Sequence, residues 1–370
     1  MMTGKKVLIT GATGFIGGRL AEKLILYHGA NVRVLVRNFA RASRIARFNV
    51  EMLGGSITDA DIVDEAVAGC DTVFHCAHDF MGKNAQQNLD GARTLADACL
   101  RHGIRRFVHV STISVYEPLS DGDVDESTPP KSTSWTYPVN KLAIENLFLQ
   151  YWEKYGLPVA VIQPTIVYGP FGGYWTNNQV TMMRAFRLAL PIGGLCNPVY
   201  VDDVVDSLIL AAQREGVVGE RFLISGAESI TWREFFGAYE RMLGIEFVAP
   251  MKTEEIKQIE NTTMRNNGLT SNLKLLRRDP RRVAHRLKRW KPVNKLYKLA
   301  QSSMGKNFAR PVSKALPAPL YVPEEQLLAL YGARASVKID KARRLLGYEP
   351  AFDLDRGMSL TAQYVKWANL

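Results

Sequence analysis

The chain has 370 residues, of which 46% are hydrophobic and 22% are charged, a composition typical of a globular protein with a sizeable core. No run of about 18 apolar residues occurs, which excludes a transmembrane helix. The net charge of +11 is concentrated in residues 274–314, where 14 basic residues stand against one acid. Because no signal peptide and no CxxC pair are visible, we expect a cytoplasmic protein without disulfides.

The first half of the chain alternates short β-rich runs with helical runs. Apolar residues at helical spacing separate buried strands, and this alternation predicts a parallel sheet covered on both faces. The expected strands are residues 7–10, 32–36, 72–76, 107–111 and 159–163, and the expected helices are residues 15–28, 85–102 and 140–155.

The alternation breaks after Gly169. We expect helices at residues 178–190, 201–213 and 339–347, a strand at 221–224 and a proline-rich connector at 311–323. The pattern therefore predicts a doubly wound parallel sheet over residues 1–170, completed by roughly 198–226. Residues 171–197 and 227–370 would form a smaller, mainly helical C-terminal substrate lobe with a basic insertion at about 252–323.

A glycine-rich loop follows the first expected strand and opens the first helix. It reads Gly11-Ala12-Thr13-Gly14-Phe15-Ile16-Gly17. Glycines permit the tight turn and a close approach of backbone to a pyrophosphate, and the helix N-terminus supplies N–H groups and partial positive charge. The alternative is an ordinary βα turn. The position before the alternating segments favours a dinucleotide site formed by Gly11, Thr13, Gly14, Phe15, Ile16 and Gly17.

The residue after the second strand predicts which cofactor binds. An acid about 20 positions after the glycines would hold the ribose hydroxyls of NAD, whereas an arginine suits the 2′-phosphate of NADP. Arg37 stands 20 residues after Gly17, Arg41 and Arg44 follow it, and no acid occurs in residues 32–50. A solvated basic loop is the alternative. We expect NADP, with NAD as the second choice.

Tyr137 and Lys141 lie four residues apart in Tyr137-Pro138-Val139-Asn140-Lys141, so a helix places both on one face. A tyrosine hydroxyl is a poor acid or base at neutral pH, but a neighbouring ammonium together with a positive nicotinamide ring would lower its pKa. Such a phenol could give a proton to a carbonyl or take one from an alcohol. The strand at 107–111 leads into Ser111, Thr112 and Ser114, which are candidates for a hydroxyl that polarises the carbonyl.

Several of these segments together resemble the extended short-chain dehydrogenase/reductases, the NAD-dependent epimerase/dehydratase-like superfamily. The matching segments run in family order: residues 11–17, 71–77, 88–91, 110–116, 137–141, 163–170, 200–204 and 339–350. The resemblance implies a Rossmann-type fold, a small-molecule substrate and a homodimer formed through a pair of helices.

The resemblance also assigns roles by position. Thr112 takes the catalytic Ser/Thr place, and Lys141 holds the nicotinamide ribose as well as acting beside Tyr137. Cys76 and Ala77 would line the cofactor groove, and Pro164 to Val167 would present backbone to the nicotinamide. The chain departs from the family where Ser56 and Ile57 replace the acid-containing element that contacts adenine. It also lacks an arginine in residues 193–198, where nucleotide-sugar enzymes usually carry one.

Three functions follow in order of preference. The first is an NAD(P)-dependent oxidoreductase that reduces a ketone or aldehyde or oxidises a secondary alcohol, with Tyr137 as the acid or base. Its substrate would be smaller or more apolar than a nucleotide sugar, because the nucleotide-sugar arginine is missing, and a lipid-like substrate is expected if residues 281–300 contact a membrane. The second is a nucleotide-sugar epimerase or dehydratase with transiently reduced NAD. The third is a non-catalytic dinucleotide-binding protein at a membrane surface.

Two further patterns in the sequence suggest a metal site and a membrane contact. His75, Cys76, His78 and Asp79 could suggest a metal site, but His75 fits a packed position on a strand, and we expect no metal. Residues 281–300 form a basic amphipathic pattern with a tryptophan, interrupted by Pro292. We interpret it first as a solvated lid helix and second as a peripheral contact with the inner face of a membrane, and we expect no nucleic-acid binding.

Overall fold

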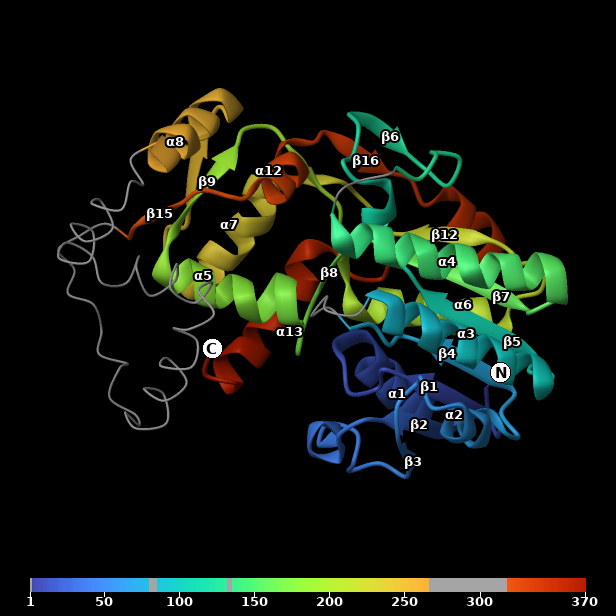
Figure 1. Ribbon diagram of the computed structural model, residues 1–370. Helices are drawn as coiled ribbons and strands as arrows, with labels where there is room; N and C mark the ends of the chain where they lie inside the picture. Colours follow the sequence, from blue (N-terminus) through green and yellow to red (C-terminus); the bar gives the residue numbers. More distant parts are fainter. Residues whose placement is uncertain (1, 80–84, 132–134, 266–317) are drawn as a thin grey trace.

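The computed structural model describes residues 2–79, 85–131, 135–265 and 318–370. Its centre is a seven-stranded sheet in which every neighbouring pair is parallel, in the order β12-β7-β5-β4-β1-β2-β3 (Figure 1). The strands are β1 (Lys6–Thr10), β2 (Asn31–Val36), β3 (Glu51–Gly54), β4 (Thr72–His75), β5 (Arg106–Val110), β7 (Val159–Pro164) and β12 (Arg221–Ile224). This order confirms the predicted doubly wound parallel sheet.

Helices cover both faces of the sheet, and the side chains of the strands alternate between them. Val7 and Ile9 of β1 belong to the core that includes Leu20 and Leu24, whereas Leu8 belongs to a second core. Burial on both faces is why these strands are continuous apolar runs. The first face carries α1 (Phe15–His28) and α6 (Val201–Gln213), and the second carries α2 (Ala60–Val67), α3 (Ala85–Arg101) and α4 (Thr136–Tyr155).

The strand order reverses between β1 and β4. The chain moves outward from β1 through β2 to β3 and then returns to the other side of β1. In open parallel sheets, ligands bind outside the carboxyl ends of the strands at such a switch point. The glycine-rich loop leaves β1 at this point, and Cys76 and Ala77 leave β4 beside it.

The helix expected at residues 178–190 is wrong from residue 186 onward. The segment 178–190 divides into a π-helix (Gly173–Asn178), helix α5 (Gln179–Ala185) and strand β9 (Arg187–Pro191). Strand β9 is the centre of a three-stranded sheet, paired in parallel with β14 (Val248–Met251) and β15 (Leu320–Tyr321). A short apolar run fits a buried strand as well as a helix, so its pairing partners, remote in sequence, decide the outcome.

The remaining helices gather on one side of the molecule, away from β1 to β3 (Figure 1). They are α7 (Trp232–Leu243), α8 (Thr253–Arg265), α12 (Glu325–Gly332) and α13 (Leu354–Trp367). Residues 342–346 form a π-helix that ends at Gly347, where a helix was expected over 339–347. Three small pairings complete this part: β8 (Ile166–Tyr168) with β11 (Pro198–Tyr200), β10 (Leu195–Cys196) with β13 (Ile230–Thr231), and β6 (Gly122–Val124) with β16 (Ala335–Val337).

No helix among the described residues is long and apolar enough to cross a bilayer. The basic pattern at 281–300, and most of the insertion at 252–323, lie outside the described residues. The membrane contact and the homodimer therefore stay predictions.

Candidate active site

Two positions of the glycine-rich loop require glycine, because a side chain there would collide with backbone atoms. Gly11 has φ 77°, and a Cβ added to it would lie 2.7 Å from the amide nitrogen of Ala77. A Cβ on Gly17 would lie 2.5 Å from the carbonyl oxygen of Gly11. The first glycine therefore allows contact with the end of β4, and the third allows α1 to pack against the loop.

The N-terminus of α1 faces this loop without a side-chain cap. Its N-cap residue is Gly14, and no side chain caps the helix there. Thr13 and Gly14 are exposed, and Phe15 and Ile16 are partly buried. An uncapped helix N-terminus offers N–H groups and positive dipole to an anion, so the segment fits a pyrophosphate, as the sequence predicted.

The carboxyl ends of β1 and β4 are joined by a hydrogen bond of 2.7 Å between Thr10 Oγ1 and His75 Nδ1. His75 is buried and stacks on His109, with ring centroids 5.3 Å apart. Burial lowers the pKa of His75 to about 3, with the Lys141 charge acting in the same direction, so the ring is neutral at ordinary pH. Among the described residues no group of three His, Cys, Asp or Glu side chains is placed to hold a metal ion.

Thr112 and Tyr137 meet at the end of β5. Thr112 caps the short helix Ile113–Tyr116, and its Oγ1 accepts a hydrogen bond of 3.2 Å from the amide of Ser114. Tyr137 lies in the first turn of α4 and is partly exposed. Burial raises the pKa of Tyr137 to about 12, although a side-chain hydrogen bond with Thr112 lowers it. The structure thus brings together two of the three predicted catalytic residues.

Lys141 lies one turn further along α4 and is buried. Its Nζ donates a hydrogen bond of 2.6 Å to the carbonyl oxygen of Val110, the last residue of β5. Burial lowers the pKa of Lys141 to about 8, against the charge of Glu145, which raises it. The sequence predicted a lowered pKa for Tyr137, but burial raises it, so Lys141 alone does not produce the lowering.

A buried polar network holds α4 against the sheet beneath these residues. The carboxylate of Glu145 is fully buried and accepts hydrogen bonds from Gln163 Nε2 at 3.0 Å and from Arg221 Nε at 2.5 Å. Tyr116 Oη in turn donates to Gln163 Oε1 at 2.9 Å. Because every member has a partner, the network fixes the rotation of α4 and with it the positions of Tyr137 and Lys141.

Two side chains next to Tyr137 were not singled out as catalytic from the sequence. The ring of His78 stands edge-on to Tyr137, with centroids 5.4 Å apart. Glu117 is buried, and its carboxylate accepts hydrogen bonds from Ser114 Oγ at 2.9 Å and from Gln326 Nε2 of α12 at 3.2 Å. Burial raises the pKa of Glu117. An acid five residues after Thr112, in the loop that leaves β5, was the signal that could have indicated it.

The predicted adenosine end of the site lies after β2 and β3. Arg37 is 69% exposed on its side chain, and its Nη1 lies 3.7 Å from a carboxylate oxygen of Asp79. Phe39 is exposed, and its ring lies 2.9 Å from a Cβ added to Gly54 at the end of β3. An exposed cation beside an exposed aromatic ring suits a phosphorylated nucleoside. The sequence had not indicated Phe39.

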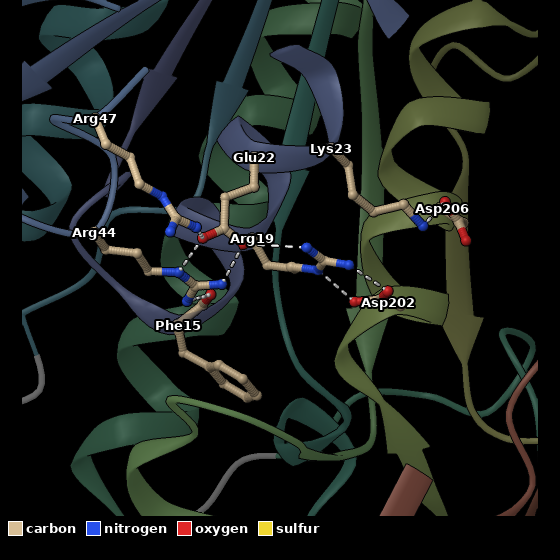
Figure 2. A network of polar contacts seen from close by, with 8 residues as sticks. All are labelled: Phe15, Arg19, Glu22, Lys23, Arg44, Arg47, Asp202 and Asp206. Carbon is tan, nitrogen blue, oxygen red and sulfur yellow. Dashed lines mark hydrogen bonds and ion pairs between the residues drawn. The ribbon is translucent and has the colours of Figure 1, made fainter. Parts of the chain in front are cut away.

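Arg44 is not placed like Arg37, although the sequence set both within reach of the cofactor. Its guanidinium forms a two-pronged ion pair with Glu22 of α1 (Figure 2). The same guanidinium lies 4.3 Å over the ring of Phe171. The edge of this cation and one of its faces are therefore engaged by the protein itself.

The other predicted cofactor residues lie along the same edge of the sheet. Ser56 shares a hydrogen bond of 2.8 Å with Thr58, and Ile57 packs against α3 at Gly91, where an added Cβ would lie 2.5 Å from its Cγ2. Pro164 ends β7, two residues beyond the position that pairs with Val110 of β5. Cys76, Ala77 and Val167 are partly buried. The contacts predicted for these residues with the cofactor stay predictions.

Residues 193–198 contain no arginine, but an arginine from another part of the chain packs against them. The side chain of Arg334 packs against Gly193, with Nη2 3.3 Å from the position of an added Cβ. Arg334 comes from the segment between α12 and β16, some 140 residues further along the chain. The absence of an arginine from residues 193–198 therefore says less about the substrate than the sequence suggested.

The parallel sheet, the bare glycine loop at its switch point and the Thr112–Tyr137–Lys141 arrangement define a dinucleotide-dependent α/β enzyme. Residues 7–225 match the model of the NAD dependent epimerase/dehydratase family. The chain belongs to this family, as the sequence resemblance indicated, and its relatives include reductases, dehydratases and epimerases.

Among the relatives is a 4-hydroxy-2-methyl-3-oxo-4-farnesyl-3,4-dihydroquinoline-1-oxide ketoreductase from Stigmatella aurantiaca, 29% identical over 65% of this chain and 74% of that protein. A dihydroflavonol 4-reductase from Zea mays is 34% identical over 58% and 68%. A dTDP-glucose 4,6-dehydratase from Actinoplanes sp. is 33% identical over 53% and 66%.

Solved structures share the fold over nearly the whole chain. The UDP-glucose 4-epimerase of Thermotoga maritima, solved with UDP-glucose, aligns with a TM-score of 0.68 at 20% identity, covering 99% of this chain and 100% of that one. The UDP-glucuronic acid 4-epimerase of Bacillus cereus, solved with NAD, aligns with a TM-score of 0.68 at 19% identity, covering 98% and 99%. At this identity the likeness supports the fold and not the reaction.

Proposed function

We propose that this chain is an NADPH-dependent reductase of a ketone or aldehyde. The observation that carries the proposal is the hydrogen bond between the side chains of Tyr137 and Thr112 beside the buried Lys141, which places a phenol and a second hydroxyl together at the end of β5. A phenol whose pKa lies near 12 keeps its proton at neutral pH. It can give this proton to a developing alkoxide during reduction and take it back when the same step runs in reverse. The reductive direction is proposed because two relatives are named as reductases.

Each residue of the site has one task in this mechanism. The bound dinucleotide supplies the hydride. Thr112 orients the carbonyl oxygen through its hydroxyl, and Tyr137 donates a proton to that oxygen as negative charge develops there. Lys141, fixed on the carbonyl of Val110, places its positive charge below the reacting oxygen and offers its remaining N–H groups to the ribose.

NADPH is the preferred cofactor in this proposal because Arg37, exposed after β2 and 3.7 Å from Asp79, offers a cation to a 2′-phosphate at the position where NAD-binding chains carry an acid. Two relatives whose names describe reduction of a carbonyl, the farnesyl-quinoline ketoreductase and the dihydroflavonol reductase, support a small and largely apolar substrate.

A second function is favoured by a separate observation. Arg334 beside Gly193 offers a cation that could bind the phosphates of a nucleotide sugar. The dTDP-glucose dehydratase relative agrees with this reading. Under it, the chain would be an epimerase or dehydratase in which NAD is reduced and reoxidised within one cycle.

The two functions differ in what they consume. We would incubate the purified chain with NADPH and a panel of aryl and prenyl ketones, and in parallel with NAD and nucleotide sugars, following the absorbance of the reduced nicotinamide. The proposal predicts one NADPH oxidised for each carbonyl reduced, and turnover by Tyr137→Phe that is lower by about 10²- to 10⁴-fold. Conversion of a nucleotide sugar without net absorbance change, by protein that retains NAD on purification, would replace it with the second function.

A further inference from the structure

A buried carboxylate next to the cofactor loop has no task in the mechanism above. Glu22 lies in the second turn of α1, and its side chain is only 7% exposed. Its oxygens accept hydrogen bonds from Arg44 Nε at 2.9 Å, Arg44 Nη2 at 2.8 Å and Arg19 Nη1 at 3.2 Å (Figure 2). Burial raises the pKa of Glu22, but these arginines bring it below the ordinary value, so the group is a carboxylate.

Arg44 belongs to the loop that begins with Arg37. Residues 37–50 connect β2 to β3, and Arg44 is held on four sides at the start of α1. Besides Glu22, its Nη1 lies 3.4 Å from the carbonyl oxygen of Phe15, its side chain packs over Gly18, and its guanidinium covers the ring of Phe171. The loop is thereby fastened to the helix that follows the phosphate-binding glycines.

We infer that the Glu22–Arg44 pair is an anchor that sets the position of Arg37 and so selects NADPH over NADH. Arg44 is a positioning residue in this account and not a ligand of the 2′-phosphate. The inference rests on the proposed NADPH preference and goes one step beyond it, since it assigns the selectivity to a pair that does not touch the cofactor. A loop that carries a phosphate-binding cation must be held in place to discriminate, because an arginine on a mobile loop loses conformational entropy on binding.

The direction in which Glu22→Gln changes the affinity for NADPH distinguishes an anchor from a direct ligand of the phosphate. Glu22→Gln preserves the shape of the side chain, removes its charge and releases Arg44. If Arg44 bound the 2′-phosphate, its release and the loss of a nearby negative charge would tighten NADPH binding. If Arg44 is an anchor, its release frees the loop and weakens NADPH binding while NADH binding is preserved.

Figure 2 also provides a matched control. Lys23, the next residue of α1, forms an ion pair of 2.6 Å with Asp206 of α6. Lys23 lies on the same helix as Glu22, and among the described residues neither partner of this pair forms a hydrogen bond or ion pair with residues 37–50. Lys23→Met therefore removes a short ion pair without releasing the loop. Glu22→Asp is a second test variant, because it keeps the charge and withdraws the carboxylate by one methylene.

The experiment measures the dissociation constants of NADPH and NADH by fluorescence titration of the full chain and of Glu22→Gln, Glu22→Asp and Lys23→Met. The anchor predicts that both Glu22 variants weaken NADPH binding by about five- to tenfold, within the usual range of coupling between linked sites. NADH binding, which also reports that each variant is folded, should change less than about twofold, and Lys23→Met should match the wild type.

The outcomes separate the two proposals. Wild-type protein that prefers NADH overturns the proposed cofactor and the anchor together. Wild-type protein that prefers NADPH, with unchanged or tighter NADPH binding in the Glu22 variants, overturns the anchor and leaves the proposed function in place. An equal loss in Lys23→Met would assign the effect to general loosening of α1 and would also overturn the anchor.

Discussion

The two ends of the candidate site are built in opposite ways. At the catalytic end, Lys141 is buried and Tyr137 and Thr112 are hydrogen-bonded to each other, on elements that lie against the sheet. At the adenosine end, Arg37 and Phe39 are exposed on a connecting loop, which is held by the buried side chains of Ala42 and Ile45 and by the ion pair of Arg44 with Glu22. Under the proposed function, the catalytic groups lie on elements packed against the sheet, and the groups proposed to select the cofactor lie on a loop.

This difference predicts that substitutions at the two ends change different measured quantities. Changes at the catalytic end should lower kcat, because they affect groups that act in the transition state. Changes at the adenosine end should alter the KM and the Kd of the cofactor, because they affect binding alone. The predictions that follow test this division, from the largest effect to the smallest.

Tyr137→Phe should give the largest effect. The substitution removes the proton donor and leaves the ring, so kcat should fall by about 10²- to 10⁴-fold, the usual contribution of a general acid. The Kd of NADPH should remain close to that of the wild type. Steady-state kinetics together with cofactor titration check both parts, and an equal loss in kcat and in cofactor affinity would contradict the separation of the two ends.

Lys141 should reveal its burial through the pH dependence of stability. Its pKa falls from 10.5 to about 8 in the folded chain, so folding releases a proton between these values. The cost of burying the charged lysine is fully present below about pH 8 and disappears as pH rises through the unfolded value of 10.5. Relative to Lys141→Met, the wild type should therefore gain stability across this window. Denaturant unfolding of both proteins at several pH values measures the gain, and parallel curves would contradict it.

The sequence predicted most of the central sheet because its strands can be recognised from their own apolar residues, without knowledge of the strands that pair with them. Six of the seven strands were expected from short, mainly apolar runs. The glycine loop and the Tyr137–Lys141 spacing have local causes, which are backbone collision at Gly17 and one turn of helix. Strand β3 and helix α2 were not expected. Strand β3 is a short edge strand that begins with the exposed Glu51, and α2 has only eight residues, so neither offers a clear period.

The parts that the sequence could not predict depend on contacts between distant residues. Glu117 becomes part of the site through Gln326, 209 residues further along the chain. Arg334 reaches Gly193 in the same way, and β9 is a strand because β14 and β15 pair with it. Neither residue spacing nor composition indicates contacts between residues so far apart in the chain. Such contacts account for most of the features that the sequence did not predict.

Arg37→Ala should affect the adenosine end alone. Loss of the exposed cation should weaken NADPH binding by about tenfold, the value of one charged contact to a phosphate, and leave NADH binding and kcat unchanged. Arg47→Ala is a suitable control, because Arg47 lies on the same loop, is similarly exposed and pairs with Glu22 only at 3.8 Å. Cofactor titration of both variants decides the matter: equal losses would show that the loop attracts NADPH by its net charge and not through Arg37.

Glu117→Gln should give the smallest effect, a shift in pH dependence at nearly constant maximal rate. The Glu117 carboxylate raises the pKa of Tyr137, so removing its charge should lower that pKa. Since Tyr137 must be protonated to act as an acid, the alkaline limb of the rate profile for reduction should move to lower pH, by less than about one unit. Glu126→Gln is the matched control, because Glu126 is another carboxyl whose pKa burial raises. It is partly buried, accepts from the amide of Leu223 and does not act on Tyr137. A shift in both variants would indicate a general change in the charge of the molecule. A shift in Glu117→Gln alone would place this carboxyl at the catalytic end. Glu117 would then be the contact through which α12 influences the pKa of Tyr137.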